Sequence, residues 1–412
     1  MTDSRSRDEK KEYLRRHMIS TDTMVERKPQ KKKSKRLKRV ALVFMLVLVF
    51  LCILIFSLWD RYYTYDSYEV LSEVTLENIG MVGCVDFGEN ILCYSRDGVT
   101  CIDTSGQKLW IESYEMKNPI ISVNGDYAAI ADSQGNSLYI FGTDGKVGQA
   151  TTTLSILRVT ISSTGVVAVT QEDSDAGYVY FFSKDGSALD ISIKALLTGD
   201  GFPIDLSLSP DGTRLIVGYQ YINGSTISGK AVFYDFSEIG KNYPNRVLGG
   251  ENEAFDDSLI ARVWYLTDDY SFVVADTGLY FFSSKNATAP QLSKSYTENI
   301  RVSCIFTSRE YVGAIVQSTA DETYSLSVYS ASGNEVFTKT LDETYTNGKI
   351  YGQYVFLYGS SSGSNTCAIY NMTGTAKYSG SVDFSVSSIR RGFWADEFVL
   401  IGSSNIKKIK LK

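Results

Sequence analysis

The stretch YAAIADSQGNSLYIF at residues 127–141 shows the pattern that decides the fold. Two short runs rich in aliphatic and aromatic residues, Tyr127–Ala131 and Ser137–Phe141, lie on either side of a polar turn. Such paired runs are typical of β-strands in hairpins. They recur along the chain after Tyr68, separated by dipeptides such as Asp144-Gly145 and Asp185-Gly186 that accept the positive φ of tight turns. The sequence therefore predicts an all-β fold for this part of the chain.

The hairpins belong to a larger unit of roughly 35 to 55 residues, and a repeat of that size is typical of propellers. We therefore expect a β-propeller with eight blades. Seven blades is the alternative count, and a long β-sandwich or two smaller β domains are the rival folds. The eight units begin near Val82, Ile120, Leu157, Pro203, Leu259, Ile300, Lys349 and Phe384.

The last unit ends with the chain after only three strands. A candidate for its fourth strand precedes the first unit, because Tyr68–Leu76 alternates between apolar and polar residues. Pairing of Tyr68–Leu76 with Ile406–Leu411 would close the ring and remove an exposed strand edge. We expect this closure.

A second feature is the uncharged stretch Val40–Trp59. Twenty residues form about 30 Å of helix, which matches the hydrocarbon core of a bilayer. The residues that follow lack the small-residue pattern of a secretory cleavage site, so the segment is expected to remain as an anchor, with Cys52 facing lipid. The expected organisation is a basic disordered tail at residues 1–39, a transmembrane helix at 40–59, a linker at 60–67 and the propeller at 68–412.

The charge distribution predicts the orientation of this helix. Residues 1–39 hold 15 basic and six acidic residues, a net charge of +9, whereas the whole chain carries −6, which leaves −15 for residues 40–412. By the positive-inside rule the tail is cytoplasmic and the propeller is extracytoplasmic, as in a type II single-pass protein. The basic block Lys31–Arg39 is expected to contact anionic lipid and no nucleic acid. A solvated tail is expected at Asp8–Met18, and one or two helical turns that a cytosolic partner reads are the alternative.

Five cysteines follow the apolar segment: Cys84, Cys93, Cys101, Cys304 and Cys367. Each lies in an apolar run, so we interpret them as small buried side chains. A disulfide among the first three is left open. The chain has no C-x-x-C motif, which excludes a zinc knuckle and a redox dithiol of that type.

Two stretches resemble known propeller families. Asp97–Trp110 resembles a quinoprotein-type repeat, in which a glycine turn follows the third strand and the tryptophan docks between blades. Ser209-Pro210-Asp211-Gly212, followed by Arg214–Val217, is similar to the turn of WD-repeat and TolB-type blades. The whole arrangement resembles single-pass envelope proteins of Gram-positive, largely clostridial, bacteria. That resemblance implies a fold and a location but no activity.

The sequence offers little for catalysis. Its single histidine, His17, lies in the tail, so the propeller has no imidazole for a Ser-His-Asp triad or a histidine-ligated metal. The match to G-x-S-x-G at residues 359–363 lies in a Ser/Gly-rich hairpin and not in a strand-to-helix turn. Quinoprotein enzymes have adjacent cysteines beneath their cofactor, and no two cysteines are adjacent here. We therefore assign no catalytic, cofactor or metal residue.

The remaining candidates are acidic pairs and long loops. Three acidic groups lie in expected turns: Asp256-Asp257, Asp268-Asp269, and Glu172-Asp173 with Asp175. Such pairs serve glycosidases, and Glu172–Gly177 also has the oxygen ligands of a calcium loop. The expected function is a binding or scaffolding module of the cell envelope, which recognises an envelope protein or cell-wall component through the loops Tyr221–Lys230 and Ser237–Ser258. A carbohydrate-active enzyme and a transmembrane sensor are the alternatives.

Overall fold

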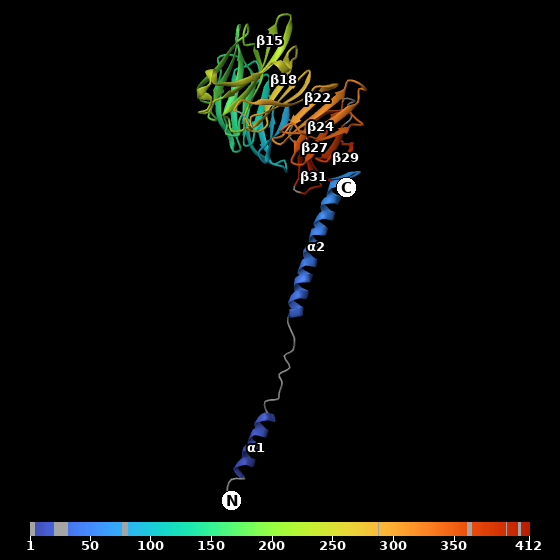
Figure 1. Cartoon of the computed structure of the whole chain (residues 1–412). Helices are drawn as coiled ribbons and strands as arrows, with labels where there is room; N and C mark the ends of the chain where they lie inside the picture. Colours follow the sequence, from blue (N-terminus) through green and yellow to red (C-terminus); the bar gives the residue numbers. More distant parts are fainter. Residues whose placement is uncertain are drawn as a thin grey trace. The chain divides into compact units, whose positions relative to one another are not determined.

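The structure is a computed structural model that describes residues 5–19, 32–75, 81–286, 288–360, 365–392, 394–402 and 405–412. It divides into two compact units, Met1–Arg61 and Tyr62–Lys412. The first unit is helical and the second is built of β-strands (Figure 1).

The first unit contains two helices. Helix α1 (Arg5–Ile19) is longer than the one or two turns expected, and an ion pair between Glu12 and Arg16, 3.7 Å apart, joins successive turns. Helix α2 (Lys32–Tyr62) begins inside the basic block that was expected to be disordered. Its segment Lys38–Ile55 is, among the described residues, the one helical stretch long and apolar enough to cross a membrane by length and composition.

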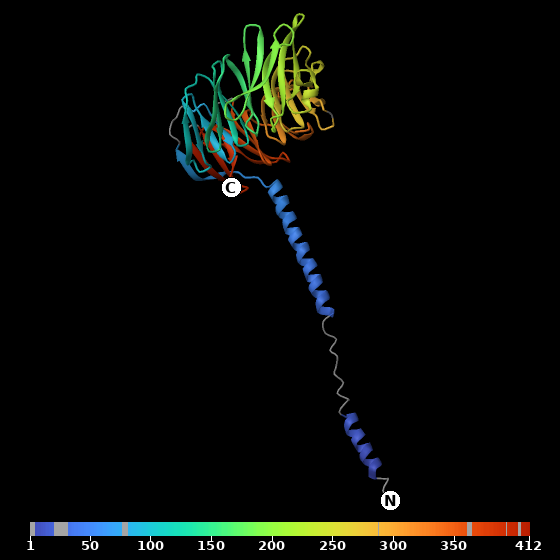
Figure 2. The same cartoon turned by 90° about the vertical axis from the view of Figure 1, so that its left-hand side faces the viewer.

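The second unit is a propeller of eight antiparallel four-stranded sheets, which we name blades 1 to 8 (Figure 2). The predicted fold class and blade count are confirmed. Blade 1 contains β2 (Gly83–Phe87), β3 (Asn90–Tyr94), β4 (Gly98–Ile102) and β5 (Lys108–Ser113); blade 2, β6 (Pro119–Asn124), β7 (Tyr127–Asp132), β8 (Ser137–Gly142) and β9 (Gly145–Thr151); blade 3, β10 (Ile156–Ile161), β11 (Val167–Glu172), β12 (Ala176–Phe182) and β13 (Ala188–Leu196); blade 4, β14 (Phe202–Leu208), β15 (Arg214–Asn223), β16 (Thr226–Asp235) and β17 (Val247–Glu251).

The other four blades follow the same order. Blade 5 contains β18 (Ile260–Tyr265), β19 (Tyr270–Ala275), β20 (Gly278–Ser283) and β21 (Gln291–Tyr296); blade 6, β22 (Ile300–Thr307), β23 (Tyr311–Ser318), β24 (Tyr324–Ser330) and β25 (Glu335–Thr340); blade 7, β26 (Tyr345–Tyr351), β27 (Tyr354–Ser360), β28 (Thr366–Asn371) and β29 (Ala376–Ser381); blade 8, β30 (Val386–Arg391), β31 (Glu397–Gly402), β32 (Asn405–Leu411) and β1 (Tyr68–Thr75).

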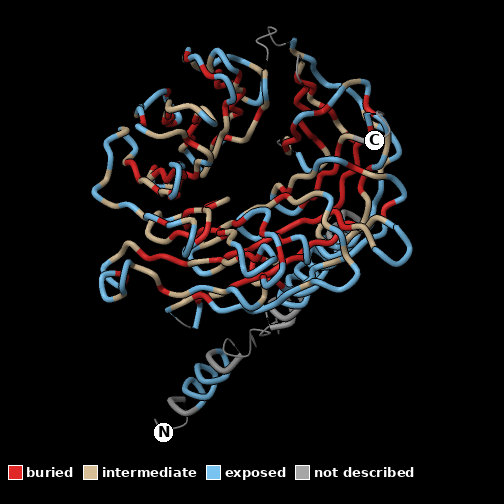
Figure 3. Tube along the Cα trace, turned by 90° about the horizontal axis from the view of Figure 1, so that it is seen from above, coloured by how far each residue is buried: buried red, intermediate tan, exposed pale blue. Residues whose placement is uncertain are grey.

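The core lies between neighbouring sheets. Phe87 and Leu92 of blade 1 pack with Ala128 and Phe141 of blade 2, and all four are completely buried. Figure 3 shows the buried chain inside the sheets and the exposed chain in the loops. The first strand of each blade is innermost, and contact between β2 and β30 completes the ring. Burial of both faces explains why the middle strands read as nearly continuous apolar runs.

The expected closure of the ring is confirmed. Strand β1 pairs antiparallel with β32, from Tyr68 opposite Leu411 to Thr75 opposite Asn405. Ile406, Ile409 and Leu411 on β32 are buried. The predicted strand extended to residue 76, which lies outside the described residues. The N-terminal strand thus completes the blade built by the C-terminal residues.

The structure corrects the interpretation of both long loops in blade 4. Residues 221–230 were expected to form a loop, but β15 and β16 continue to Asn223 and Thr226 as a regular hairpin, since Ile222 and Ile227 pair in register. Residues 237–258 were expected to connect two blades. They contain the outer strand β17 and three short 3-10 helices, η1 (Gly240–Asn242), η2 (Pro244–Arg246) and η3 (Glu253–Phe255). Because Phe255 is completely buried, replacing this segment by a short turn would remove a core side chain and disrupt the fold.

Candidate functional site

The inner strands of blades 2 to 6 line a central cavity of about 570 Å³. Its charged lining residues are three arginines and one aspartate: Arg158, Arg262, Arg309 and Asp205. Cavities of this size hold small ligands in many proteins.

Hydroxyl groups join the inner strands from blade to blade. In three successive junctions, a Ser or Thr on one inner strand accepts a hydrogen bond from a backbone N–H on the next. The donor and acceptor pairs are Ile161 to Ser122 Oγ (3.2 Å), Leu208 to Thr160 Oγ1 (3.2 Å) and Tyr265 to Ser207 Oγ (2.9 Å). These bonds satisfy inner-strand donors and fix the cavity wall.

Asp205 on β14 is the centre of a charged cluster in this wall. Its carboxylate accepts hydrogen bonds from Arg262 Nε and from the backbone N–H of Val263, each at 2.9 Å, and lies 3.8 Å from Arg158 Nε. Burial raises the pKa of the Asp205 carboxyl, and the two guanidinium groups oppose that shift. The guanidinium of Arg262 also lies over the ring of Trp264, at 5.2 Å from its centroid.

A second charged cluster joins blades 7 and 8 to blade 1. Lys349 Nζ on β26 lies 2.7 Å from Asp86 on β2 and donates to Ser388 Oγ on β30 at 2.9 Å. Burial lowers the pKa of Lys349, and the Asp86 carboxylate opposes that shift. Arg390 donates to three backbone carbonyls where β2 turns into β3, those of Gly88, Glu89 and Asn90. This cluster therefore has a structural role in closing the ring.

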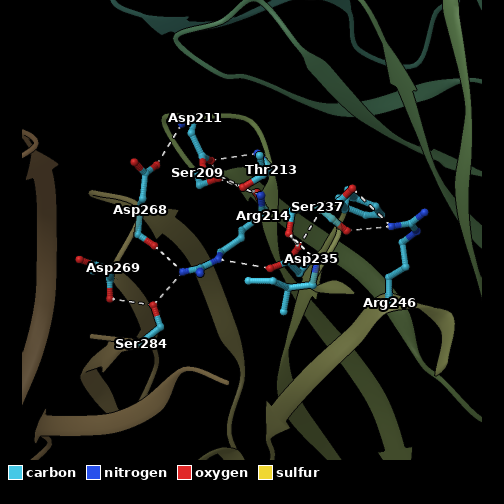
Figure 4. A network of polar contacts seen from close by, with 12 residues as sticks. Ser209, Asp211, Thr213, Arg214, Asp235, Ser237, Arg246, Asp268, Asp269 and Ser284 are labelled. Carbon is cyan, nitrogen blue, oxygen red and sulfur yellow. Dashed lines mark hydrogen bonds and ion pairs between the residues drawn. The ribbon is translucent and has the colours of Figure 1, made fainter. Parts of the chain in front are cut away.

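The turn that resembles WD-repeat blades is part of a polar network between blades 4 and 5 (Figure 4). Arg214 lies 3.5 Å from Asp235, and its Nη1 donates to the carbonyl of Asp268 at 2.9 Å and to Ser284 Oγ at 3.0 Å. The Asp268 carboxylate accepts the backbone N–H of Asp211 at 3.0 Å. This candidate catalytic carboxylate thus holds two blades together.

The other acidic candidates also make local contacts. Asp256 accepts a hydrogen bond from Ser228 Oγ at 3.0 Å, and Asp173 accepts one from the adjacent Ser174 N–H at 2.8 Å. Glu172 pairs with Gly177 across a tight hairpin. None of the three acidic groups predicted from the sequence lines the central cavity. Within the described residues, no group of three or more His, Cys, Asp or Glu is placed to hold a metal ion. Residues 361–363 of the G-x-S-x-G match lie outside the described part.

The strand register shows which of the first three cysteines form a disulfide. Cys84 and Cys93 lie opposite each other on β2 and β3 and form a disulfide, with their Cα atoms 4.2 Å apart. The disulfide that the sequence left open is therefore formed, and both side chains are buried as expected. Cys101 and Cys367 are buried too, with free thiols whose pKa values burial raises to about 11 and about 12, whereas Cys304 is only half-buried.

The hairpin of β15 and β16 presents an exposed apolar pair. Ile222 is 80% exposed and Ile227, its partner in register, is 52% exposed. Each strand has ten residues, which makes this hairpin longer than those of the other blades. Two neighbouring isoleucines exposed on a regular hairpin form a small apolar surface that a partner could cover.

The tryptophan expected from the quinoprotein-type resemblance docks between blades 1 and 2. Trp110 Nε1 donates to the carbonyl of Thr143 at 2.7 Å, and the indole stacks on Phe141 with ring centroids 5.8 Å apart.

The fold and its central cavity define the protein as an eight-bladed β-propeller. The chain belongs to the family of unknown function DUF5711, which matches residues 61–411.

One solved structure supports the fold. BamB from Moraxella catarrhalis is similar with a TM-score of 0.50 and 12% identity, over 84% of this chain and all of that chain. Kuenenia stuttgartiensis hydrazine synthase has a TM-score of 0.45 and 12% identity, over 73% of this chain and 98% of that one. At such identities the likeness concerns the fold alone. No curated protein matches the chain.

Proposed function

We propose that the chain is a single-pass membrane protein whose propeller lies outside the membrane and acts as a binding or scaffolding module of the cell envelope. The apolar segment of α2 and the contrast between +9 in residues 1–39 and −15 in the rest support this topology. The expected division into a tail at 1–39, a span at 40–59, a linker at 60–67 and a propeller at 68–412 is part of the proposal.

The disulfide between Cys84 and Cys93 supports the same location. Disulfides persist in oxidising compartments outside the cytoplasm and are rare inside it. The pair lies in the first hairpin of the propeller, which is the part of the chain that we propose to be outside the membrane.

The observation that carries the binding role is the exposed isoleucine pair on the hairpin of blade 4. Ile222 and Ile227 leave apolar surface in water at a place where β15 and β16 pair regularly with each other. A partner that covers them gains about 25 cal/mol for each Å² of apolar area removed from water, without first ordering the hairpin. We expect an envelope protein of neutral or basic charge as the partner.

A cysteine crosslinking experiment tests location and binding together. A membrane-impermeant thiol-reactive crosslinker is applied to intact cells that express Ser225→Cys, Ser295→Cys or Ser4→Cys in the full chain. Ser225→Cys at the hairpin tip should give a discrete protein adduct, and Ser295→Cys on β21 should react without that adduct. The adduct should disappear when Ile222→Asp and Ile227→Asp are added. Reaction at Ser4→Cys would overturn the topology, and equal adducts at positions 225 and 295 would overturn the binding role of the hairpin.

A further inference from the structure

The central cavity is basic, although the part of the chain that forms the propeller is acidic. Its charged lining residues are three arginines against one aspartate, which gives a net charge of +2, whereas residues 40–412 carry −15. A basic cavity in an acidic domain attracts anions locally while the outer surface repels them. The cavity therefore selects an anionic group that fits inside it.

Asp205 orients the arginines without neutralising them. Its side chain is 5% exposed and already accepts two hydrogen bonds, from Arg262 Nε and the Val263 N–H. One carboxylate faces two guanidinium groups, so one positive charge of this cluster is uncompensated. The side chains of Arg158 and Arg262 are 49% and 56% exposed, which leaves their ends accessible from the cavity.

Arg262 has hydrogen-bond donors that are available to a ligand. Its Nε is bound to Asp205, and across the part of the chain that the structure describes its two terminal nitrogens donate no hydrogen bond. The contact with the ring of Trp264 holds the guanidinium plane in place. A guanidinium fixed at Nε and on one face presents its terminal edge as a fork, and that geometry matches the two oxygens of a carboxylate.

The walls complete the site. Apolar residues on the inner strands, such as Pro119 and Ile121, line the cavity beside the arginines. Arg309 spans from blade 6 to blade 2 through a hydrogen bond from its Nη2 to Asn124 Oδ1 at 3.0 Å. An occupant therefore meets the charged cluster of blades 3, 4 and 5, and around it a lining that mixes polar groups such as Ser122 and Asn124 with apolar side chains.

We propose that Arg158 and Arg262, oriented by Asp205 and Trp264, form a binding site for a carboxylate group in the central cavity. The carboxylate belongs to a small organic acid or to the C-terminus of a peptide, since both present the same two oxygens. This site does not depend on the hairpin of blade 4 or on the location of the propeller.

Calorimetric titration of the detergent-solubilised full chain tests the proposal. The probes are succinate, N-acetyl-Gly-Gly-Ala with a free carboxylate, the same peptide with an amidated end, and inorganic phosphate. Succinate or the free-acid peptide should bind, with an affinity that falls as salt is added, and the amidated peptide should not. Binding of succinate alone identifies a small acid as the source, and binding of the free-acid peptide identifies a chain terminus.

Matched variants separate the fork from the charge. Arg262→Gln should lower the affinity at least tenfold, and Arg262→Lys, which keeps the charge but not the fork, should also lower it severalfold. Arg158→Gln gives a second variant in case Arg262→Gln fails to fold. Arg96→Gln, an exposed arginine outside the cavity, should bind like the parent chain. Equal binding of acid and amide peptides, binding of phosphate but of neither carboxylate probe, or unchanged affinity in folded Arg262→Gln would overturn the proposal.

Discussion

Arg390 on β30 is the side chain on which the junction between the last and first blades most depends. It is 4% exposed and supplies donors to three carbonyls where β2 turns into β3. Its Nε lies 3.7 Å from Asp86, which also receives Lys349. Without Arg390, Asp86 keeps Lys349 as its partner, but the three carbonyls lose their buried charged donor, and such a loss is costly.

Arg390→Met should therefore lower the free energy of unfolding by about 3 to 5 kcal/mol. The methionine fills part of the space but leaves carbonyls of the turn unbonded. Urea unfolding of the full chain, followed by tryptophan fluorescence, measures the change. Arg301→Met on β22, where the arginine is exposed, should unfold like the parent chain. Equal stability of the two variants would show that Arg390 does not hold the junction.

Residue-scale chemistry was only partly predictable from the sequence. The docking of Trp110 was implied by the resemblance of Asp97–Trp110 to a quinoprotein-type repeat. Asp205 and Arg262 are 57 residues apart, and only the ring brings their strands together. A single charged residue on several successive inner strands is the sequence signal for this cluster. The Cys84–Cys93 pair required the register of β2 and β3, which spacing alone does not give.

At the scale of elements, β1 and β32 are matched by charge as well as by burial. Strand β1 carries Glu69 and Glu73, and the basic end of the chain supplies their partners. Lys412 Nζ lies 2.6 Å from Glu69, and Lys407 Nζ lies 3.4 Å from Glu73 and 2.6 Å from Asp383. Opposite charges across neighbouring strands favour this pairing over a shifted register.

Deletion of residues 404–412 should expose β1 and β31 as strand edges and remove three buried apolar side chains. Each such side chain contributes about 1.5 to 3 kcal/mol. The melting temperature of the full-length anchored chain should fall by more than about 10 °C. Lys412→Ala, which removes only the exposed pair with Glu69, should change it by about 2 °C or less. A truncated chain that melts like the parent would contradict the closure by β1.

The inner and middle strands were predictable because apolar runs and glycine turns are local signals. Outer strands were harder to recognise. Strand β17 contains two glycines and lies between short 3-10 helices, so its sequence reads as a loop. The extension of β15 and β16 beyond Tyr219 also has the sequence of a loop. It lies outside the interface between blades, so its residues need not be apolar.

At the scale of the whole molecule, several carboxylates are stabilised in their charged form by the fold. Hydrogen bonds from Ser183 and Ser187 lower the pKa of Asp185 to about 2. A hydrogen bond from Lys412 lowers the pKa of Glu69, and one from Lys407 lowers that of Asp383. Asp205 is the exception, because its burial raises its pKa.

These shifts set the sign of the pH dependence. A carboxyl whose pKa is lower in the folded chain stabilises the fold above its unfolded value, near 4, and that contribution is lost as the pH falls through the folded value. Asp205 contributes to the pH dependence with the opposite sign, but it is one group, whereas several carboxyls have a lowered pKa. The free energy of unfolding should therefore decrease as the pH falls from about 5 towards 2.

Urea unfolding at pH 7, 5, 4 and 3 measures this acid sensitivity. Asp185→Asn cannot take up a proton in this range, so this variant should lose less stability between pH 4 and pH 3 than the parent chain does. Asp97→Asn, at an exposed turn position with no side-chain bond in the described structure, should follow the parent curve. If stability rose as the pH fell, the raised pKa of Asp205 would outweigh the lowered pKa values of Asp185, Glu69 and Asp383. The buried carboxyl of Asp205 would then determine the pH dependence more than the exposed carboxylates do.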